Sequence, residues 1–182
     1  MHRIDLQVQK HFGVGLIYVA NGDGWLDLGP RRVRCALGPA GVVAAAEKRE
    51  GDGASPAGVW PIRRVLYRPD RGSPPRTALP VQAIAPDDGW CDAPDDPAYN
   101  RPVRLPYPAS AERMWRDDPL YDLVVVLGHN DDPPAPGLGS AIFLHLAKHE
   151  YAPTHGCVAV ARADLEALLE AARPGDALEI RR

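Results

Sequence analysis

Proline and glycine occur so often in this chain that no long helix is expected. The 182 residues include 20 prolines and 17 glycines. Proline removes a hydrogen bond from a helix interior and glycine weakens it, whereas both suit the turns between short strands. One helix is predicted over residues 162–172, because apolar residues recur there with helical spacing. These residues are Leu165, Leu168, Leu169 and Ala172.

Short strands account for most of the remaining pattern. Residues 3–9 and 32–37 alternate between polar and apolar side chains, as in a half-buried strand. Residues 121–127, YDLVVVL, form a continuous apolar run that is typical of a buried strand. A turn is expected at residues 55–58, and one or two helical turns at residues 110–116. The other predicted strands are residues 14–20, 25–28, 42–46, 59–62, 81–85, 141–144, 158–160 and 177–180.

Size and charge exclude several classes of protein. The length suits a single domain over residues 1–182, and 45% hydrophobic residues can supply its core. A net charge of −3 gives no electrostatic case for binding nucleic acid. No stretch approaches the ~18–20 apolar residues that span a bilayer. The first residues alternate in polarity and do not read as a signal peptide.

The three cysteines are Cys35, Cys91 and Cys157. An odd count leaves at least one free thiol. Cys35 and Cys91 would be able to pair in an exported protein, but two separate buried thiols are the favoured interpretation.

Residues 142–160, IFLHLAKHEYAPTHGCVAV, carry the strongest chemical signal. His145 ends one apolar run, and Cys157 directly precedes the next. A thiol is a poor nucleophile while protonated, and an imidazole within hydrogen-bonding reach favours the thiolate. Gly156 gives the backbone freedom, so that main-chain N–H groups there can point at a developing oxyanion.

The tetrapeptide Thr154-His155-Gly156-Cys157, preceded by a histidine on a strand, resembles the active-site signature of the YkuD-type L,D-transpeptidase family. Ser55-Pro56-Ala57-Gly58, followed by a strand, resembles a Pro-x-Gly turn of the same family. The segments Gly89-Trp90-Cys91 and Tyr99-Asn100-Arg101 resemble a third family region. The resemblance implies a mainly β fold, either a β-sandwich or a bent mixed sheet, with one C-terminal helix and long loops.

The resemblance also implies a reaction. Cys157 would attack a peptidoglycan tetrapeptide stem, and His145 would act as its base, oriented by a backbone carbonyl. The N–H groups of Cys157 and Gly156 would hold the oxyanion. An amine of a second stem, or water, would then resolve the thioester. The resemblance implies no cofactor and no metal, susceptibility to carbapenem-type inhibitors, and a place in the cell envelope or periplasm, although without a visible signal peptide a cytoplasmic protein or a trimmed chain remains an alternative.

Five further residues are candidates for substrate binding. Thr154 and His155 would shape the pocket, and Ser55 would lie near its rim by resemblance to the family. His129 and Asn130 follow the strand at residues 121–127 and would face the same cleft. The alternative for His129 and Asn130 is a capped loop, and the alternative for Ser55 is a purely structural turn.

Two segments near the expected site have open interpretations. Residues 90–118 form a long, aromatic-rich insertion, which is either a lid over the cleft or a loop that packs its own aromatic side chains. Residues 63–80 are rich in arginine and proline. They form either a solvated surface loop or a cationic rim for an acidic peptide.

Other functions compete with transpeptidation. Ala159 stands where the family has an arginine, and the connection from His145 to Thr154 is short, so hydrolysis by an L,D-carboxypeptidase is a close alternative. His145, His149, His155 and Cys157 would offer a zinc site, but the glutamate of H-E-x-x-H is missing. A non-catalytic wall-binding module ranks last, because the Cys–His pair is present. The sequence indicates no oligomeric state.

Overall fold

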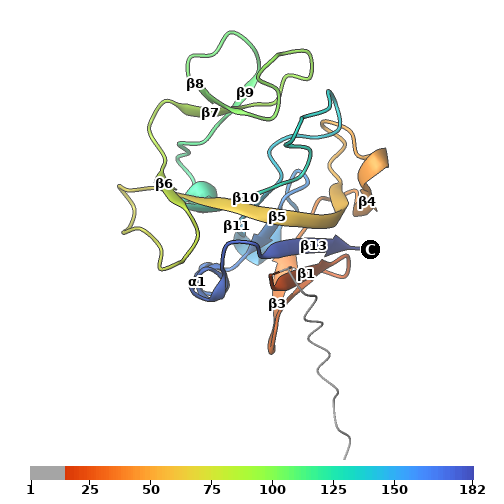
Figure 1. The fold of residues 1–182 in the computed structure, drawn as a ribbon, viewed down its shortest axis with the longest axis vertical. Helices are drawn as coiled ribbons and strands as arrows, with labels where there is room; N and C mark the ends of the chain where they lie inside the picture. The colour runs from red at the N-terminus through yellow and green to blue at the C-terminus, as the bar shows by residue number, and fades with distance from the viewer. Residues whose placement is uncertain (1–14) are drawn as a thin grey trace, which may run out of the picture.

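The structure is a computed structural model that describes residues 15–182, so the strand expected at residues 3–9 lies outside the described residues. Eight strands form a mixed sheet that closes on itself, because the long strand β5 pairs with β13 on one side and with β10 on the other (Figure 1). The closed order is β10 (Leu123–Leu127), β11 (Phe143–Leu146), β12 (Val158–Val160), β3 (Arg31–Ala36), β2 (Trp25–Leu28), β1 (Ile17–Asn21), β13 (Ala177–Arg181) and β5 (Ser55–Tyr67).

Shorter elements flank this ring. The strands β4 (Val42–Ala44) and β6 (Val81–Ala83) both run parallel to β5. Three single-turn helices occupy connections: η1 (Ala45–Glu47), η2 (Pro119–Tyr121) and η3 (His149–Tyr151). The one α-helix, α1 (Arg162–Ala171), agrees with the prediction. In the described part of the chain, none of the helices has the length and apolar character that a bilayer crossing requires.

Alternation along β11 divides the apolar side chains between two cores. Leu144 and Leu146 belong to the main core, which also contains the buried leucines of α1. Phe143 belongs to a second core, and His145 is on the same face because residues two apart share one side of a strand. The two faces of one short strand therefore join a hydrophobic interior to a separate, partly polar region.

The second core packs beneath a small three-stranded sheet with the order β8 (Pro102–Arg104), β7 (Asp88–Cys91) and β9 (Ala111–Arg113). This small sheet is drawn at the top of Figure 1, apart from the closed ring. Trp90 of β7 contacts Phe143 of β11 edge to face, with 5.0 Å between ring centroids. The insertion at residues 90–118 thus shares the second core with β5, β10 and β11 and is attached through it to the strand that carries His145.

The mainly β fold with a C-terminal helix is confirmed, but two local predictions are wrong. Residues 55–58 are the start of β5 and not a turn, because Ser55 lies opposite Val42 of the parallel strand β4. Residues 110–116 contain β9 in place of helical turns, because Glu112 pairs with Trp90 of β7. In both places pairing with a distant strand overrides the local signal.

Candidate active site

The parallel pair β11 and β12 brings Cys157 and His145 to the same face. Leu144 of β11 lies opposite Val158 of β12, so Cys157, the residue before Val158, lies opposite Phe143. Phe143 and His145 are two residues apart on β11, so their side chains and that of Cys157 share one face. Both side chains are buried, with 7% of Cys157 and 5% of His145 exposed. Both line one cavity of about 440 Å³. The sequence alone predicted this meeting of a thiol and an imidazole at neighbouring strands.

The ring of His145 is held in a neutral form. Its Nδ1 lies 2.9 Å from the carbonyl oxygen of Leu146, and because a carbonyl only accepts, Nδ1 is the donor. Burial lowers the pKa of His145 to about 4, and the hydrogen bond to the Leu146 carbonyl offsets only part of this decrease. Tyr121 packs edge-on against the ring, at 5.3 Å between centroids. The ring therefore keeps Nε2 unprotonated, as a general base requires.

Cys157 is a protonated thiol held by the main chain. Its Sγ donates to the carbonyl oxygen of Ala141 at 3.1 Å and accepts from the N–H of Phe143 at 3.4 Å. Burial, and to a smaller degree the Glu112 carboxylate, raises the pKa of the Cys157 thiol to about 12. These directions are opposite to those of a thiolate–imidazolium pair. The expectation that His145 acidifies the thiol is wrong for this resting arrangement.

A tight turn precedes the cysteine. The Thr154 hydroxyl accepts from the N–H of Gly156 at 3.1 Å and donates to the carbonyl of Cys157 at 2.7 Å. Gly156 has a φ of +126°, and a Cβ there would lie 2.7 Å from the carbonyl oxygen of Ala54. Glycine is therefore required by space as well as by conformation. Its N–H, expected to face an oxyanion, is bonded to Thr154.

The comparisons with known proteins show the family of the chain. The family model for the YkuD L,D-transpeptidase catalytic domain matches residues 16–180. This chain belongs to the YkuD family. The crystal structure of Mycobacterium tuberculosis L,D-transpeptidase 1 is similar at 13% identity with a TM-score of 0.41, over 91% of this chain and 58% of that one. The YkuD domain thus spans little more than half of that protein's length. No curated protein matches the chain.

The YkuD domain places only some of the candidate substrate-binding residues at the cavity. Thr154 and His155 line it. Ser55, His129 and Asn130 are not among its lining residues in the described chain. The Ser55 hydroxyl accepts from the N–H of Gly38 at 3.0 Å, and Asn130 binds the backbone of its own loop.

His129 likewise contacts protein groups and not the cavity. Its Nε2 lies 3.0 Å from the Leu138 carbonyl oxygen, and its ring packs edge-on to Trp60 at 4.6 Å between centroids. The contacts of Ser55, His129 and Asn130 are those of residues that shape the scaffold of the YkuD domain.

Sequence reasoning missed Asn100, which connects the insertion to the catalytic strands. Its Nδ2 donates to the carbonyls of His129 and Asn130, at 3.1 and 2.6 Å. Its Oδ1 accepts from the Trp90 indole at 2.9 Å and from the N–H of Ala141 at 3.0 Å. The carbonyl of Ala141 in turn accepts from the Cys157 thiol. The resemblance of Tyr99-Asn100-Arg101 to the family pointed to this segment. It did not show which of the three side chains contacts the strands around Cys157.

Glu112 and Tyr121 were also missed. Glu112 lies on β9 and lines the cavity with Tyr121, whose hydroxyl donates to Oε1 of Glu112 at 2.7 Å. Burial raises the pKa of Glu112, which the Tyr121 hydroxyl and Arg116 oppose. Residues 110–116 were predicted as helical turns, so the strand β9 was not expected. Nor was it expected that the Glu112 side chain lines the cavity that contains Cys157. β9 therefore supplies a charged wall to the cavity.

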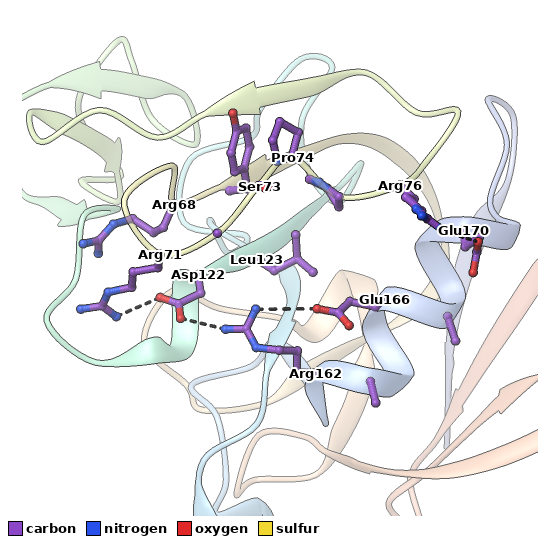
Figure 2. Close-up of a pocket in the computed structure, with 15 residues that line it drawn as sticks. Arg68, Arg71, Ser73, Pro74, Arg76, Asp122, Leu123, Arg162, Glu166 and Glu170 are labelled. Atoms are coloured by element: carbon purple, nitrogen blue, oxygen red, sulfur yellow. Dashed lines mark hydrogen bonds and ion pairs between the residues drawn. The ribbon is translucent and has the colours of Figure 1, made fainter.

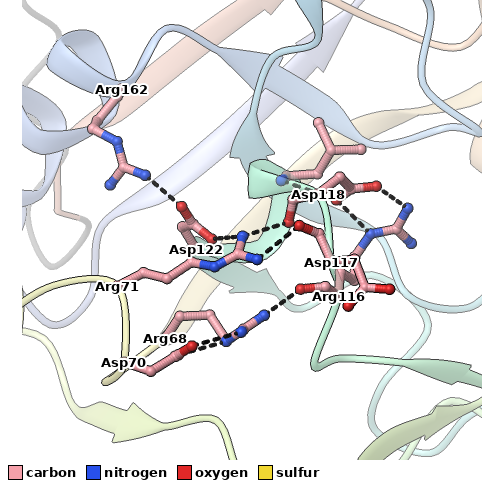
Figure 3. Close-up of polar contacts among 9 residues, drawn as sticks. Arg68, Asp70, Arg71, Arg116, Asp117, Asp118, Asp122 and Arg162 are labelled. Atoms are coloured by element: carbon pink, nitrogen blue, oxygen red, sulfur yellow. Dashed lines mark hydrogen bonds and ion pairs between the residues drawn. The ribbon is translucent and has the colours of Figure 1, made fainter.

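A second cavity of about 470 Å³ lies between residues 68–76 and α1 (Figure 2). Its lining contains neither Cys157 nor His145. Asp122 pairs there with Arg71 at 2.9 Å and with Arg162 at 2.8 Å. Figure 3 shows the same network continuing through Asp70 and Asp118. The arginines of residues 63–80 that enter this network are paired with carboxylates, and no residue of 63–80 lines the Cys157 cavity in the described chain.

Cys35, Cys91 and His149 are not among the residues that line the Cys157 cavity. Cys35 and Cys91 are free, buried thiols. In residues 15–182, no three His, Cys, Asp or Glu side chains are grouped so that they would hold a metal ion. His149, part of the zinc alternative, is exposed in η3.

Proposed function

We propose that this YkuD domain is a cysteine-dependent L,D-transpeptidase that acts on peptidoglycan stem peptides. The family acts on peptidoglycan. The observation that carries the proposal is the placement of Cys157 and His145 on one face of adjacent strands, lining one cavity. A neutral imidazole beside a neutral thiol suits general-base catalysis, because no buried charge has to exist before substrate binds. The family also implies action in the cell envelope.

The first half-reaction forms a thioester. The Cys157 thiol leaves the Ala141 carbonyl and gives its proton to Nε2 of His145 as Sγ attacks the carbonyl after the third residue of the stem. The N–H of Cys157 is the proposed oxyanion donor, since the N–H of Gly156 binds Thr154. The carbon–nitrogen bond to the terminal D-residue then breaks, and His145 returns the proton to the departing amine.

The second half-reaction breaks the thioester. An amine of another stem attacks it, loses a proton to His145, and the Cys157 thiol is regenerated. Water in place of the amine would give an L,D-carboxypeptidase. Ala159 lies opposite His145 and lines the cavity, at the position where the family has an arginine. The absence of that arginine is the reason for retaining hydrolysis as the second candidate.

Incubation with a purified disaccharide-tetrapeptide, followed by mass spectrometry, tests the proposal. Cross-linked dimers are expected for a transpeptidase and tripeptides for a carboxypeptidase. A carbapenem should acylate the protein at Cys157. Cys157→Ala should abolish all three results, whereas Cys35→Ala, which also removes a buried thiol, should retain them. A wild-type protein that gives no dimer, no tripeptide and no acyl adduct overturns the proposal.

A further inference from the structure

The small sheet contributes two carboxylates to the cavity that contains Cys157. Glu112 lies on β9, and Asp92 follows β7, the strand paired with β9. Oδ1 of Asp92 is buried and has no hydrogen-bond partner in the described structure. The Oγ of Ser140, a residue only 8% exposed that also lines the cavity, is likewise without a partner there. Buried polar atoms of this kind are normally satisfied by protein, water or ligand.

The Glu112 carboxylate, when ionised, opposes formation of the Cys157 thiolate. Its carboxylate is close enough to Cys157 to raise the pKa of the thiol, in addition to the larger effect of burial. A negative charge beside a sulfur that has to become anionic costs free energy. A cation placed next to Glu112 would cancel this effect at the moment when substrate is bound.

The cations already present neutralise these carboxylates only in part, since Arg116 forms an ion pair with Glu112 but is shared with Asp118. Arg116 approaches Glu112 at 3.6 Å, but its Nε and Nη2 bind both oxygens of Asp118 at 2.9 and 2.6 Å (Figure 3). Lys48 is buried and paired with Asp52. Lys148 lines the cavity but is itself exposed. The carboxylates from the small sheet therefore keep the capacity to bind a further positive charge.

We propose that Glu112, together with Asp92, forms a subsite for a primary ammonium group of the substrate and determines its specificity. Tyr121 fixes the Glu112 carboxylate, and the unpaired oxygens of Asp92 and Ser140 supply further acceptors. The proposal rests on the proposed function, in which a substrate reaches Cys157 through this cavity. Binding of the ammonium group both positions the peptide and removes the electrostatic obstacle to thiolate formation.

The charge selectivity of Cys157 tests the subsite without any turnover. Each methanethiosulfonate reagent forms a mixed disulfide with the thiolate and releases methanesulfinate. The reagents are the 2-aminoethyl and 2-sulfonatoethyl forms, and labelling of Cys157 is followed by site-resolved mass spectrometry. Both labelling rates are proportional to the fraction of Cys157 that is thiolate, and Glu112→Gln changes that fraction. The ratio of the two rates is independent of it and reports only the preference for a charged reagent. We expect the cationic-to-anionic ratio to fall about tenfold in Glu112→Gln, and Asp92→Asn to lower it in the same direction.

Glu166→Gln is the matched control, because it removes one negative charge on the exposed side of α1 and should leave the ratio unchanged. Circular dichroism melting of each variant excludes unfolding as the cause. An unchanged ratio in both Glu112→Gln and Asp92→Asn overturns the subsite, even if dimers or tripeptides still form. A lowered ratio in a protein that forms no product would instead count against the proposed function alone.

Acetylated substrates identify which ammonium group is recognised. If it belongs to the acyl donor, acetylation of the donor side chain should raise KM for the wild type and have little effect on Glu112→Gln. If it belongs to the acceptor, Glu112→Gln should instead raise the ratio of tripeptide to dimer formed from unmodified stems, because the acceptor binds less well and water resolves more of the thioester. Equal effects of donor acetylation on wild type and Glu112→Gln, together with an unchanged ratio of tripeptide to dimer, would contradict both assignments.

Discussion

At the residue scale, the site combines two side chains whose ordinary charges are suppressed by burial. The Cys157 thiol is bonded to main-chain groups of Ala141 and Phe143, and the His145 ring donates to Leu146. Neither charge exists until a substrate carbonyl is present to receive the electron pair of sulfur. Premature oxidation is thereby limited as well, because the reactive species in thiol oxidation is the thiolate.

A resting neutral pair predicts the absence of thiolate absorbance. The difference in ultraviolet absorbance near 240 nm between wild type and Cys157→Ala should show no thiolate band between about pH 5 and pH 9, because the thiol pKa is raised to about 12. Cys35→Ala serves as the control, since burial also raises the pKa of Cys35 to about 12. A band at neutral pH that disappears on acidification would show an ion pair and contradict the neutral site.

The catalytic candidates could be found from the sequence, but their surroundings could not. Cys157 and His145 stand where apolar runs begin and end, so their meeting follows from a short connection between two strands. Glu112 and Asn100 come from an irregular insertion, where no periodicity shows which side chain turns inward. Their roles depend on how a distant segment packs over β11, which local sequence does not contain.

At the element scale, a buried amide adds to the apolar contacts that attach the small sheet to the ring. Asn100 has a φ of 55° and is only 3% exposed, and its side chain connects β7 to the two ends of the loop at residues 128–141. Asparagine tolerates this left-handed conformation better than most residues. One side chain thus fixes both the small sheet and the segment that supports the Cys157 sulfur.

Replacing Asn100 should loosen this attachment. Asn100→Gly keeps a residue suited to positive φ and removes the four hydrogen bonds, leaving buried carbonyls and an indole N–H without partners. We expect a loss of about 2–4 kcal/mol in the free energy of unfolding, measured with urea. Asp95→Gly, at an exposed position of the same insertion, controls for the flexibility of glycine. Equal stability of the two variants would argue against the proposed attachment.

The elements themselves were predictable to different degrees. The strand at β10 and the helix α1 follow from local patterns, because burial and period are both visible in the sequence. Residues 55–58 misled because Pro56 and Gly58 usually mark turns, whereas here both lie in β5 between parallel and antiparallel partners. Residues 110–116 misled because their strand exists only through its pairing with β7.

At the scale of the whole molecule, a closed ring separates two cores, and the candidate site lies on the outer side of that ring. Closure requires β5 to pair with both β13 and β10, which are far apart in sequence. Local patterns predict the strands but not the order in which they pair. The sequence therefore did not distinguish a β-sandwich from a sheet that closes on itself. That residues 1–182 form a single domain stays a prediction.

Burial of His145 should make the whole molecule less stable in acid. In the unfolded chain histidine has a pKa near 6.5, whereas in the folded protein burial lowers that of His145 to about 4. The unfolded state therefore binds more protons between these values, and the free energy of unfolding falls as pH decreases through this window. The contribution of His145 reaches about 3 kcal/mol at most near pH 4.

Urea unfolding at about pH 7 and about pH 4.5 measures this effect. His145→Gln should reduce the loss of stability on acidification, because it removes the buried group that binds a proton only in the unfolded chain. His149→Gln, which changes an exposed histidine, should unfold with the pH dependence of the wild type. A wild-type slope in His145→Gln would place the acid sensitivity elsewhere.

The hydrogen bonds of the Cys157 sulfur have a mechanical consequence. Its partners, Ala141 and Phe143, belong to the segment that leads into and begins β11, the same strand that carries His145. Thermal displacement of β11 therefore carries nucleophile and base together, as parts of one rigid body. The spacing between the sulfur and the imidazole therefore stays constant while β11 moves.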